Sequence, residues 1–270
     1  MSSSIGSIAS VHRYPVKSMM GEQIASTSVT HDGVLGDRSY ALRDTETGKI
    51  VSAKNPKRWP NLFGYSAAYT NALSDSAALP SVRVTSPDGA TSVSSSADFA
   101  RRLSLSLGRD VDLRAVPPQV PQIEEYWPDI DESRKRNVVT DETIRSGSFF
   151  DCAPLHLLTT STLKHFSELN PGSRFEQRRF RPNFLVDTGE EQGFVENDWI
   201  GKTFAMGPEV LIEVTGPCPR CVMTILAQGD LPYDPRVLKA AAQNNHARVG
   251  VYASVKRAGT VRTGDTMSIV

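Results

Sequence analysis

The stretch that decides the fold lies toward the C-terminal end of the chain, at residues 210–226, and reads VLIEVTGPCPRCVMTIL. Apolar and β-branched residues occupy both of its ends, at Val210–Val214 and at Val222–Leu226. Such residues favour the pleated, half-buried surface of a sheet, so each end predicts a β-strand. The glycine and two prolines between them predict a tight turn that joins the two strands.

Two of the three cysteines of the chain, Cys218 and Cys221, lie in this predicted turn with Arg220 between them. A C-x-x-C redox motif normally stands between a strand and a helix, so a strand after Cys221 argues against a thioredoxin-like role. A zinc site would need two further close ligands, and the sequence offers no matching pair. A thiolate beside a cation at the end of a strand is suited to hold a soft metal.

The composition of the whole chain excludes several classes of protein. The 270 residues suffice for one large domain or two small ones. The 30 Lys and Arg residues equal the 30 Asp and Glu residues, so no net field favours nucleic acid or an anionic membrane. No apolar run is long enough to span a bilayer, and the N-terminus lacks the pattern of a secretory signal. The three cysteines favour a reducing, cytoplasmic location and are too few for an all-thiolate iron–sulfur cluster.

Short apolar stretches separated by turn signals run through the first half of the chain. Asp32-Gly33 and Ser86-Pro87-Asp88-Gly89 are two of these turn signals. Strands at such regular, short intervals predict a barrel or a sandwich rather than a parallel α/β fold. Phe99, Leu103 and Leu107 have helical spacing and are followed by Gly108, which predicts a short helix that ends there.

Three further segments allow more than one interpretation. Residues 117–148 show no clear period and predict a long loop, either a belt packed over the barrel or a lid over a site. Thr159–Thr162 begins a predicted helix, whose N-terminus could bind phosphate or could be an ordinary N-cap. The arginine-rich run from Arg174 to Arg181 is most simply a solvated face, except that Arg181 lies at the start of an apolar strand with Asn183 nearby.

Four short motifs resemble, in their order along the chain, those of the MOSC-domain family. They are Tyr14–Ser18, Gly36–Arg38, Phe180–Asn183, and Cys218–Cys221 with Thr224 after it. The resemblance extends over nearly the whole chain and is greatest for the branch that includes the mitochondrial amidoxime reducing component and its bacterial counterparts. It implies a mainly β fold with some α (α+β), in which a MOSC β-barrel core follows a smaller N-terminal MOSC-associated β-barrel-like domain. The expected domains are residues 1–115 and 116–270.

The resemblance also implies a cofactor, the molybdenum cofactor (Mo-molybdopterin). Cys221 matches the cysteine whose thiolate binds molybdenum in that family and is the expected catalytic residue. Cys218 is expected to be a small buried residue that supports the turn, and Cys152 to lie in the core. The expected cofactor contacts are Lys17, Ser18 and Arg38 at the phosphate, Arg181 and Asn183 on the opposite side, and Ser161 and Thr162 at the start of the predicted helix.

The activity that the resemblance implies is reduction of small N-hydroxylated compounds such as amidoximes, hydroxylamines or N-hydroxylated bases. The electrons are expected from a separate protein, which would be cytochrome b5-like, ferredoxin-like or a flavoprotein. An alternative is a carrier of the cofactor or a sulfur-transfer protein without turnover of its own. A third possibility is a β-barrel scaffold in which the two cysteines are an adventitious zinc-binding or redox pair.

Overall fold

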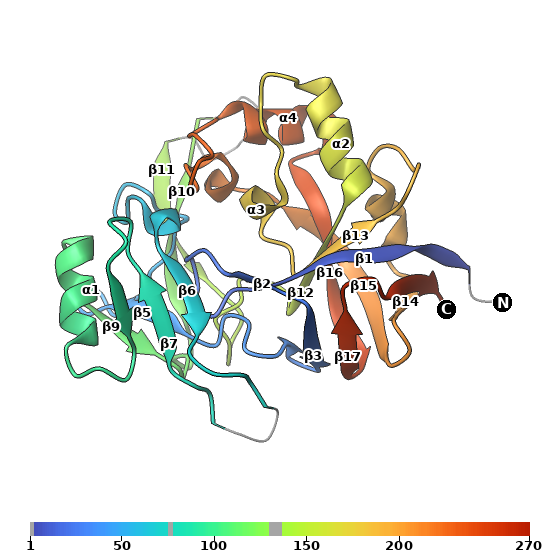
Figure 1. Ribbon diagram of the computed structural model, residues 1–270. Coiled ribbons are helices and arrows are strands. Elements are labelled where there is room, and N and C mark those ends of the chain that lie inside the picture. The colour runs from blue at the N-terminus through green and yellow to red at the C-terminus, as the bar shows by residue number, and fades with distance from the viewer. Residues whose placement is uncertain (1–2, 75–77, 130–136) are drawn as a thin grey trace. The chain divides into compact units, whose positions relative to one another are not determined.

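The computed structural model of the protein describes residues 3–74, 78–129 and 137–270 (Figure 1). Strands make up 38% of the chain and helices 17%, which confirms the predicted mainly β class. Packing divides the chain into two compact units. We call them the barrel unit, Met1–His12, Gln23–Leu35 and Ala153–Val270, and the second unit, Arg13–Glu22 and Gly36–Cys152.

A closed ring of seven strands forms the barrel unit (Figure 1). The ring closes where β1 pairs with β13, and this neighbour relation makes the sheet a barrel. β12 and β13 run parallel, and the other six neighbouring pairs in the ring are antiparallel. In ring order the strands are β13 (Phe184–Asp187), β12 (Leu155–Thr159), β16 (Arg248–Arg257), β15 (Val210–Pro219), β14 (Thr203–Met206), β18 (Thr266–Ile269) and β1 (Ser4–Arg13).

The barrel interior is filled by side chains at every second position along the strands, while the residues between them face outward. On β15, Val210, Ile212 and Val214 are fully buried, and the residues between them are partly exposed. This period of two is that of a half-buried strand, and it agrees with the strand that the apolar, β-branched residues predicted. The other elements of the unit are β2 (Glu22–Ile24), β3 (Ser26–Thr30), β4 (Gly33–Val34), β17 (Gly259–Arg262), α2 (Thr160–Leu169), α3 (Gln177–Phe180), α4 (Arg236–Asn245), and the 3₁₀ helices η2 (Val195–Trp199) and η3 (Val222–Ile225).

Small antiparallel sheets and one helix make up the second unit. Helix α1 (Phe99–Leu107) ends at Gly108, whose φ of 68° lies in the left-handed region, as predicted. Ala41, Ile50, Ile123, Ile144 and Phe149 form one of its buried clusters. The strands are β5 (Ala41–Asp44) with β9 (Val111–Arg114), β6 (Ser66–Tyr69) with β7 (Val82–Thr85) and β8 (Thr91–Val93), and β10 (Gln122–Trp127) with β11 (Val138–Thr143), and η1 is Leu62–Gly64.

The hairpin of β10 and β11 corrects the loop predicted for residues 117–148. The two strands pair antiparallel over six residue pairs, from Gln122 with Thr143 to Trp127 with Val138. Glutamates at 124 and 125 hide the apolar alternation in the sequence, but Ile123 is fully buried and fixes which face points inward. Part of the predicted loop, residues 130–136, lies outside the described residues.

The expected division into residues 1–115 and 116–270 remains a prediction about sequence modules. The compact units are interleaved along the chain, because β1 and β3 from the N-terminal end pack with the barrel strands. In the part of the chain that the structure describes, no helix has the length and apolar character needed to cross a membrane.

Candidate functional site

Cys221 lies at the start of a short 3₁₀ helix rather than in a turn between two strands. β15 continues through Cys218 to Pro219, so the predicted turn is the irregular end of a strand, with shifts of register at Val214/Gly216 and at Pro217/Pro219. The segment after Cys221 is η3, which corrects the predicted strand. The backbone N–H and the hydroxyl of Thr224 both donate to the Cys221 carbonyl, at 3.2 and 3.0 Å, and this local capping favours a helical turn.

A fully buried arginine holds the segment that follows Cys221. Arg179 donates from Nη1 to the carbonyls of Thr224 and Leu226, both at 3.2 Å, and from Nη2 to the carbonyl of Pro232 at 2.9 Å. Its Nε donates to the carbonyl of Arg174 at 2.9 Å. Four backbone carbonyls are thereby tied to one rigid fork, and burial lowers the pKa of this guanidinium. The prediction that the arginine run is a solvated face is therefore wrong for Arg179.

The buried Cys218 and the partly exposed Arg220 form a pair that links the end of β15 to α3. Arg220 donates from Nη1 to the Cys218 sulfur at 2.7 Å and from Nη2 to the Phe180 carbonyl at 2.9 Å. Burial by itself raises the pKa of the Cys218 thiol, but Arg220 and His156 outweigh burial and lower it to about 6. Cys218 is buried, as expected, and its surroundings favour a thiolate at neutral pH.

Arg181 and Asn183 lie between α3 and β13, directly after Phe180, whose carbonyl accepts from Arg220. Asn183 exchanges hydrogen bonds with His156: its backbone N–H donates to the His156 carbonyl at 2.8 Å, and its Oδ1 accepts from the His156 backbone N–H at 3.1 Å. Both Asn183 and Arg181 are buried. Through Arg220 and His156, the structure ties the segment with these two residues to the segment with Cys218 and Cys221.

Ser161 and Thr162 lie at the start of α2, where the helix is capped from within the protein. The Thr159 hydroxyl accepts from the Thr162 backbone N–H at 3.2 Å, which is the ordinary N-cap alternative. The hydroxyls of Thr159 and Thr162 both donate to Glu196 Oε2 at 2.7 Å, and that of Ser161 donates to the Gly193 carbonyl at 3.1 Å. Burial raises the pKa of Glu196, against the effect of these hydroxyls. No local pattern in the sequence pointed to this carboxyl group.

In the second unit the structure brings Lys17, Ser18 and Arg38 together. Two chain segments pair here, because the Lys17 N–H donates to the Tyr40 carbonyl at 2.8 Å and the Arg38 N–H to the Tyr14 carbonyl at 2.7 Å. Arg38 is ion-paired with Asp37, and its guanidinium carbon lies 4.8 Å from the centre of the Tyr14 ring.

The polar groups of Lys17 and Ser18 already have partners within this unit. Lys17 is buried and donates to the Phe149 carbonyl at 2.9 Å and to Asp151. The Ser18 hydroxyl accepts from the Ala53 backbone N–H at 3.0 Å. Burial lowers the pKa of Lys17, and Asp151 opposes that change.

Three of the predicted site residues have left-handed backbone conformations that side chains other than glycine seldom adopt. Ser18, Arg38 and Arg181 have φ values of 65°, 48° and 55°. Each such residue costs on the order of 1–2 kcal/mol and persists where the surrounding structure holds it. Strain of this kind concentrates at functional sites, and here it marks predicted residues in both units.

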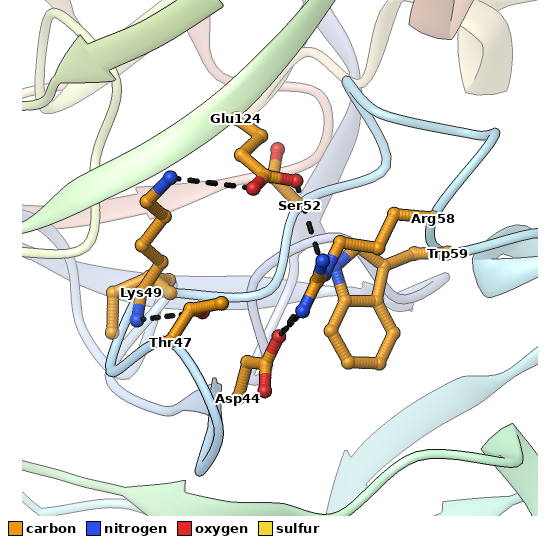
Figure 2. Close-up of a pocket in the computed structure, with 8 residues that line it drawn as sticks. Asp44, Thr47, Lys49, Ser52, Arg58, Trp59 and Glu124 are labelled. Atoms are coloured by element: carbon orange, nitrogen blue, oxygen red, sulfur yellow. Dashed lines mark hydrogen bonds and ion pairs between the residues drawn. The ribbon is translucent and has the colours of Figure 1, made fainter.

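An ion-pair network lines a hollow elsewhere in the second unit. None of the predicted site residues lines this hollow. Figure 2 shows Arg58 directed at Asp44, and Lys49 at Glu124. Arg58 Nη2 lies 2.6 Å from Asp44 Oδ2, and Lys49 Nζ lies 3.3 Å from Glu124 Oε1. These contacts tie β5 and the segment after it to β10, so we assign this network to the fold.

The three cysteines differ in exposure, and this separates their chemistry. Cys152 is exposed, which shows that the expectation of a core residue is wrong; it lies in an irregular bend rather than in a strand. Cys218 is buried and Cys221 is partly exposed, and neither is in a disulfide. Within residues 3–74, 78–129 and 137–270, no three His, Cys, Asp or Glu side chains gather as a metal-binding group.

Comparison with known proteins places these features in a family. The model of the MOSC domain matches residues 144–268, and the model of the MOSC N-terminal beta barrel domain matches residues 5–105. Mitochondrial amidoxime reducing component 2 of Macaca fascicularis is 26% identical over 299 aligned residues, which cover 97% of this chain and 82% of that protein.

A solved structure supports the same fold over the whole length. The YUAD protein from Bacillus subtilis superposes with a TM-score of 0.50 at 11% identity, covering 100% of this chain and 98% of that one. At this identity the likeness concerns the fold alone. From its two domain matches and its barrel, the chain is a member of the MOSC-domain family that carries the MOSC N-terminal β-barrel domain in front of the MOSC domain.

Proposed function

We propose that this protein binds the molybdenum cofactor through Cys221 and reduces small N-hydroxylated compounds with electrons from a separate protein. Membership of the MOSC family supports the cofactor, and the name of the relative from Macaca fascicularis, an amidoxime reducing component, supports the reaction class. The observation that carries the proposal is the setting of Cys221, a partly exposed thiol at the start of an anchored 3₁₀ turn, beside Arg220 and the buried Cys218.

The residues around Cys221 fit a metal that is already held by sulfur. A thiolate is the form of cysteine that binds metal, and a neighbouring guanidinium favours that form. A single protein thiolate suffices if the other ligands belong to a dithiolene, which agrees with the lack of a three-residue ligand group among the described residues. When bound, this cofactor supplies a metal that can accept an oxygen atom from a substrate and exchange two electrons.

The other predicted contacts would hold the organic part of the cofactor. Lys17 and Arg38 present the cations that a phosphate requires, one as a point charge and one as a planar fork. Arg181 and Asn183 are proposed to contact the pterin. Asn183 suits that role because its amide can both donate and accept hydrogen bonds.

Ser161 and Thr162, at the start of α2, are proposed to contact the cofactor on one condition, which concerns the present partners of their hydroxyls. Their hydroxyls now donate to Gly193 and Glu196, so they must leave these acceptors before they can donate to a cofactor. Removal of the Thr162 hydroxyl then weakens cofactor binding only if this exchange takes place. If Thr162→Val retains the cofactor as the wild type does, Thr162 is only part of the helix cap.

The reaction is tested by turnover with a chemical electron donor. The protein, purified from a host that makes the cofactor, is given benzamidoxime and reduced donor, and formation of benzamidine is measured. We expect turnover in the wild type and none in Cys221→Ala. Stoichiometric molybdenum without turnover on any N-hydroxylated compound would instead support a cofactor carrier or a sulfur-transfer protein. Zinc, or no metal, in the wild type would overturn both.

The phosphate assignment predicts unequal effects of two arginine substitutions. Arg38→Ala removes a guanidinium that lies with Lys17 and Ser18 at the proposed phosphate contact. Arg174→Ala removes one that is half exposed and pairs with Glu176 and Asp230. We expect the purified Arg38→Ala protein to retain at least about tenfold less pterin than Arg174→Ala, since a charge-assisted bidentate contact contributes about 1.5–3 kcal/mol. The pterin content is measured by fluorescence after oxidative release. Equal retention in the two variants would remove the assignment.

A further inference from the structure

Three cationic side chains from separate segments of the second unit meet around Asp151. Its Oδ1 accepts from the buried Lys17, and its Oδ2 lies 3.3 Å from Lys54 Nζ. Arg38 lies close enough to interact electrostatically with Asp151 and with Lys17. Burial alone would raise the pKa of Asp151, but the Lys17 and Lys54 ammonium groups hold it well below its usual range. Asp151 is thus an anion enclosed by three cations.

The carboxylates of this cluster differ in how firmly they are held. Asp37 pairs with Arg38 and accepts from the Tyr14 N–H at 2.7 Å, and its side chain is 0% exposed. Glu125 pairs with Lys54 at 3.2 Å from strand β10, and its side chain is 8% exposed. The Asp151 side chain is 28% exposed. It also lies in an irregular bend, outside any helix or strand, so it is the carboxylate that can move aside at least cost.

The net charge of the cluster indicates which kind of anion could replace the Asp151 carboxylate. With Asp37 on Arg38 and Glu125 on Lys54, the fixed groups of the cluster leave one positive charge, which Asp151 neutralises. A phosphate monoester carries a charge of about −1.5 to −2 at neutral pH and offers three strong acceptor oxygens. It can therefore take the place of one carboxylate and accept from more than one cation at once.

We propose that Asp151 is a resident anion in a phosphate-binding site formed by Lys17, Lys54 and Arg38, and that a phosphate monoester displaces it on binding. This deepens the proposed function, on which it rests for the identity of the ester as the phosphate end of the cofactor, and it assigns Lys54 and Asp151 to that site. Without ligand, the Asp151 carboxylate keeps the buried cations neutralised. When the ligand binds, the Asp151 side chain rotates outward into solvent, and phosphate oxygens take its place.

Competition between Asp151 and phosphate sets the direction of each substitution. Asp151→Asn keeps the size of the side chain and removes the competing charge, so it strengthens phosphate binding. Lys54→Met removes a cation that the phosphate would meet and weakens it. Lys54→Arg keeps the charge and restores binding. Asp112→Asn is the matched control, because Asp112 is likewise ion-paired, with Arg43, and its side chain has a similar exposure of 32%.

The test is isothermal titration of the full-length, cofactor-free protein with inorganic phosphate at low salt. We expect Asp151→Asn to bind phosphate at least about tenfold more tightly than the wild type, and Lys54→Met at least about tenfold more weakly. Asp112→Asn should match the wild type. Asp151→Ala serves as a second variant, with folding checked by circular dichroism. The proposal is overturned if Asp151→Asn binds like Asp112→Asn, if Lys54→Met binds like the wild type, or if no variant binds phosphate.

The outcome is separable from that of the proposed function. Phosphate binding by the cofactor-free protein needs neither molybdenum nor Cys221. If phosphate follows the expected order while the protein never holds molybdenum, the anion site stands and the proposed function fails. If the protein holds molybdenum at Cys221 but substitutions of Asp151 and Lys54 leave phosphate binding unchanged, the anion site is wrong and the cofactor site at Cys221 stands.

Discussion

At the scale of single residues, Cys218 and Cys221 lie three positions apart but have different surroundings. Cys218 is buried against Arg220, which reaches its sulfur at 2.7 Å. Cys221 is partly exposed at the start of η3. Because Cys218 is buried and Cys221 is not, Cys221 is the cysteine of this pair that is accessible to an external ligand.

The Cys218 thiolate predicts a stability that depends on pH. Its pKa falls from 9.0 to about 6 on folding, so the contribution is complete above pH 9 and is lost as the pH falls through 6. We expect Cys218→Ser to lower the free energy of unfolding by up to about 4 kcal/mol at pH 9 and by much less at pH 5. Urea unfolding at both pH values measures this, with Cys152→Ser as the exposed control. A pH-independent difference would show that Cys218 is a neutral thiol.

The unequal roles of the two cysteines were expected from the resemblance to the MOSC family, because the C-P-R-C motif and its apolar flanks did not by themselves choose between Cys218 and Cys221. The buried arginine was not predicted. Whether an arginine is solvated depends on which carbonyls the fold brings to it, and those of Arg179 come from residues 45 to 53 positions later in the chain. No local pattern contains that information. The same holds for Glu196 and Asp151.

At the scale of elements, the segment from Cys221 to Pro232 is held mainly through its backbone. It contains the single turn η3, and its carbonyls at Thr224, Leu226 and Pro232 all accept from Arg179. Apolar, β-branched residues predicted a strand here, but these contacts and the Thr224 cap override that propensity. The position of Cys221 thus depends on a side chain of another element, α3.

Removal of the Arg179 guanidinium should destabilise the protein strongly. Arg179→Met leaves buried backbone carbonyls without their donors, and each such loss costs about 1–3 kcal/mol. We expect a total loss of about 3 kcal/mol or more in urea unfolding. Arg174→Met, which removes a half-exposed guanidinium on the same segment, should cost less than about 1 kcal/mol. Equal effects of the two substitutions would contradict the role given to Arg179.

At the scale of the whole molecule, two compact units are built from interleaved segments of the chain. Turn signals and short strands were enough to predict a mainly β chain that forms a barrel or a sandwich, because both signals are local, and the resemblance to the MOSC family favoured the barrel. They could not show that β1 closes the barrel, since the pairing of β1 with β13 joins residues about 175 positions apart. They also missed the hairpin of β10 and β11, whose glutamates hide the alternation.

Closure of the barrel depends on a glycine in β1. A Cβ atom on Gly6 would lie 2.2 Å from the Asp187 carbonyl oxygen of β13, so any side chain there must push the two strands apart. We expect Gly6→Ala to cost about 2 kcal/mol or more, because the clash is with backbone. Gly216→Ala on β15, where a Cβ would meet nothing within 4 Å, should cost less than about 1 kcal/mol. Thermal unfolding of both variants measures this, and a neutral Gly6→Ala would contradict the closure.

The central claim is that one accessible thiol of this chain binds molybdenum. It is tested most directly by mass-spectrometric metal analysis of protein purified from a host that makes the cofactor. We expect close to one molybdenum per chain in the wild type and in Cys152→Ser, and almost none in Cys221→Ser, with all three proteins folded. Molybdenum retained in Cys221→Ser, or absent from the wild type, would contradict it.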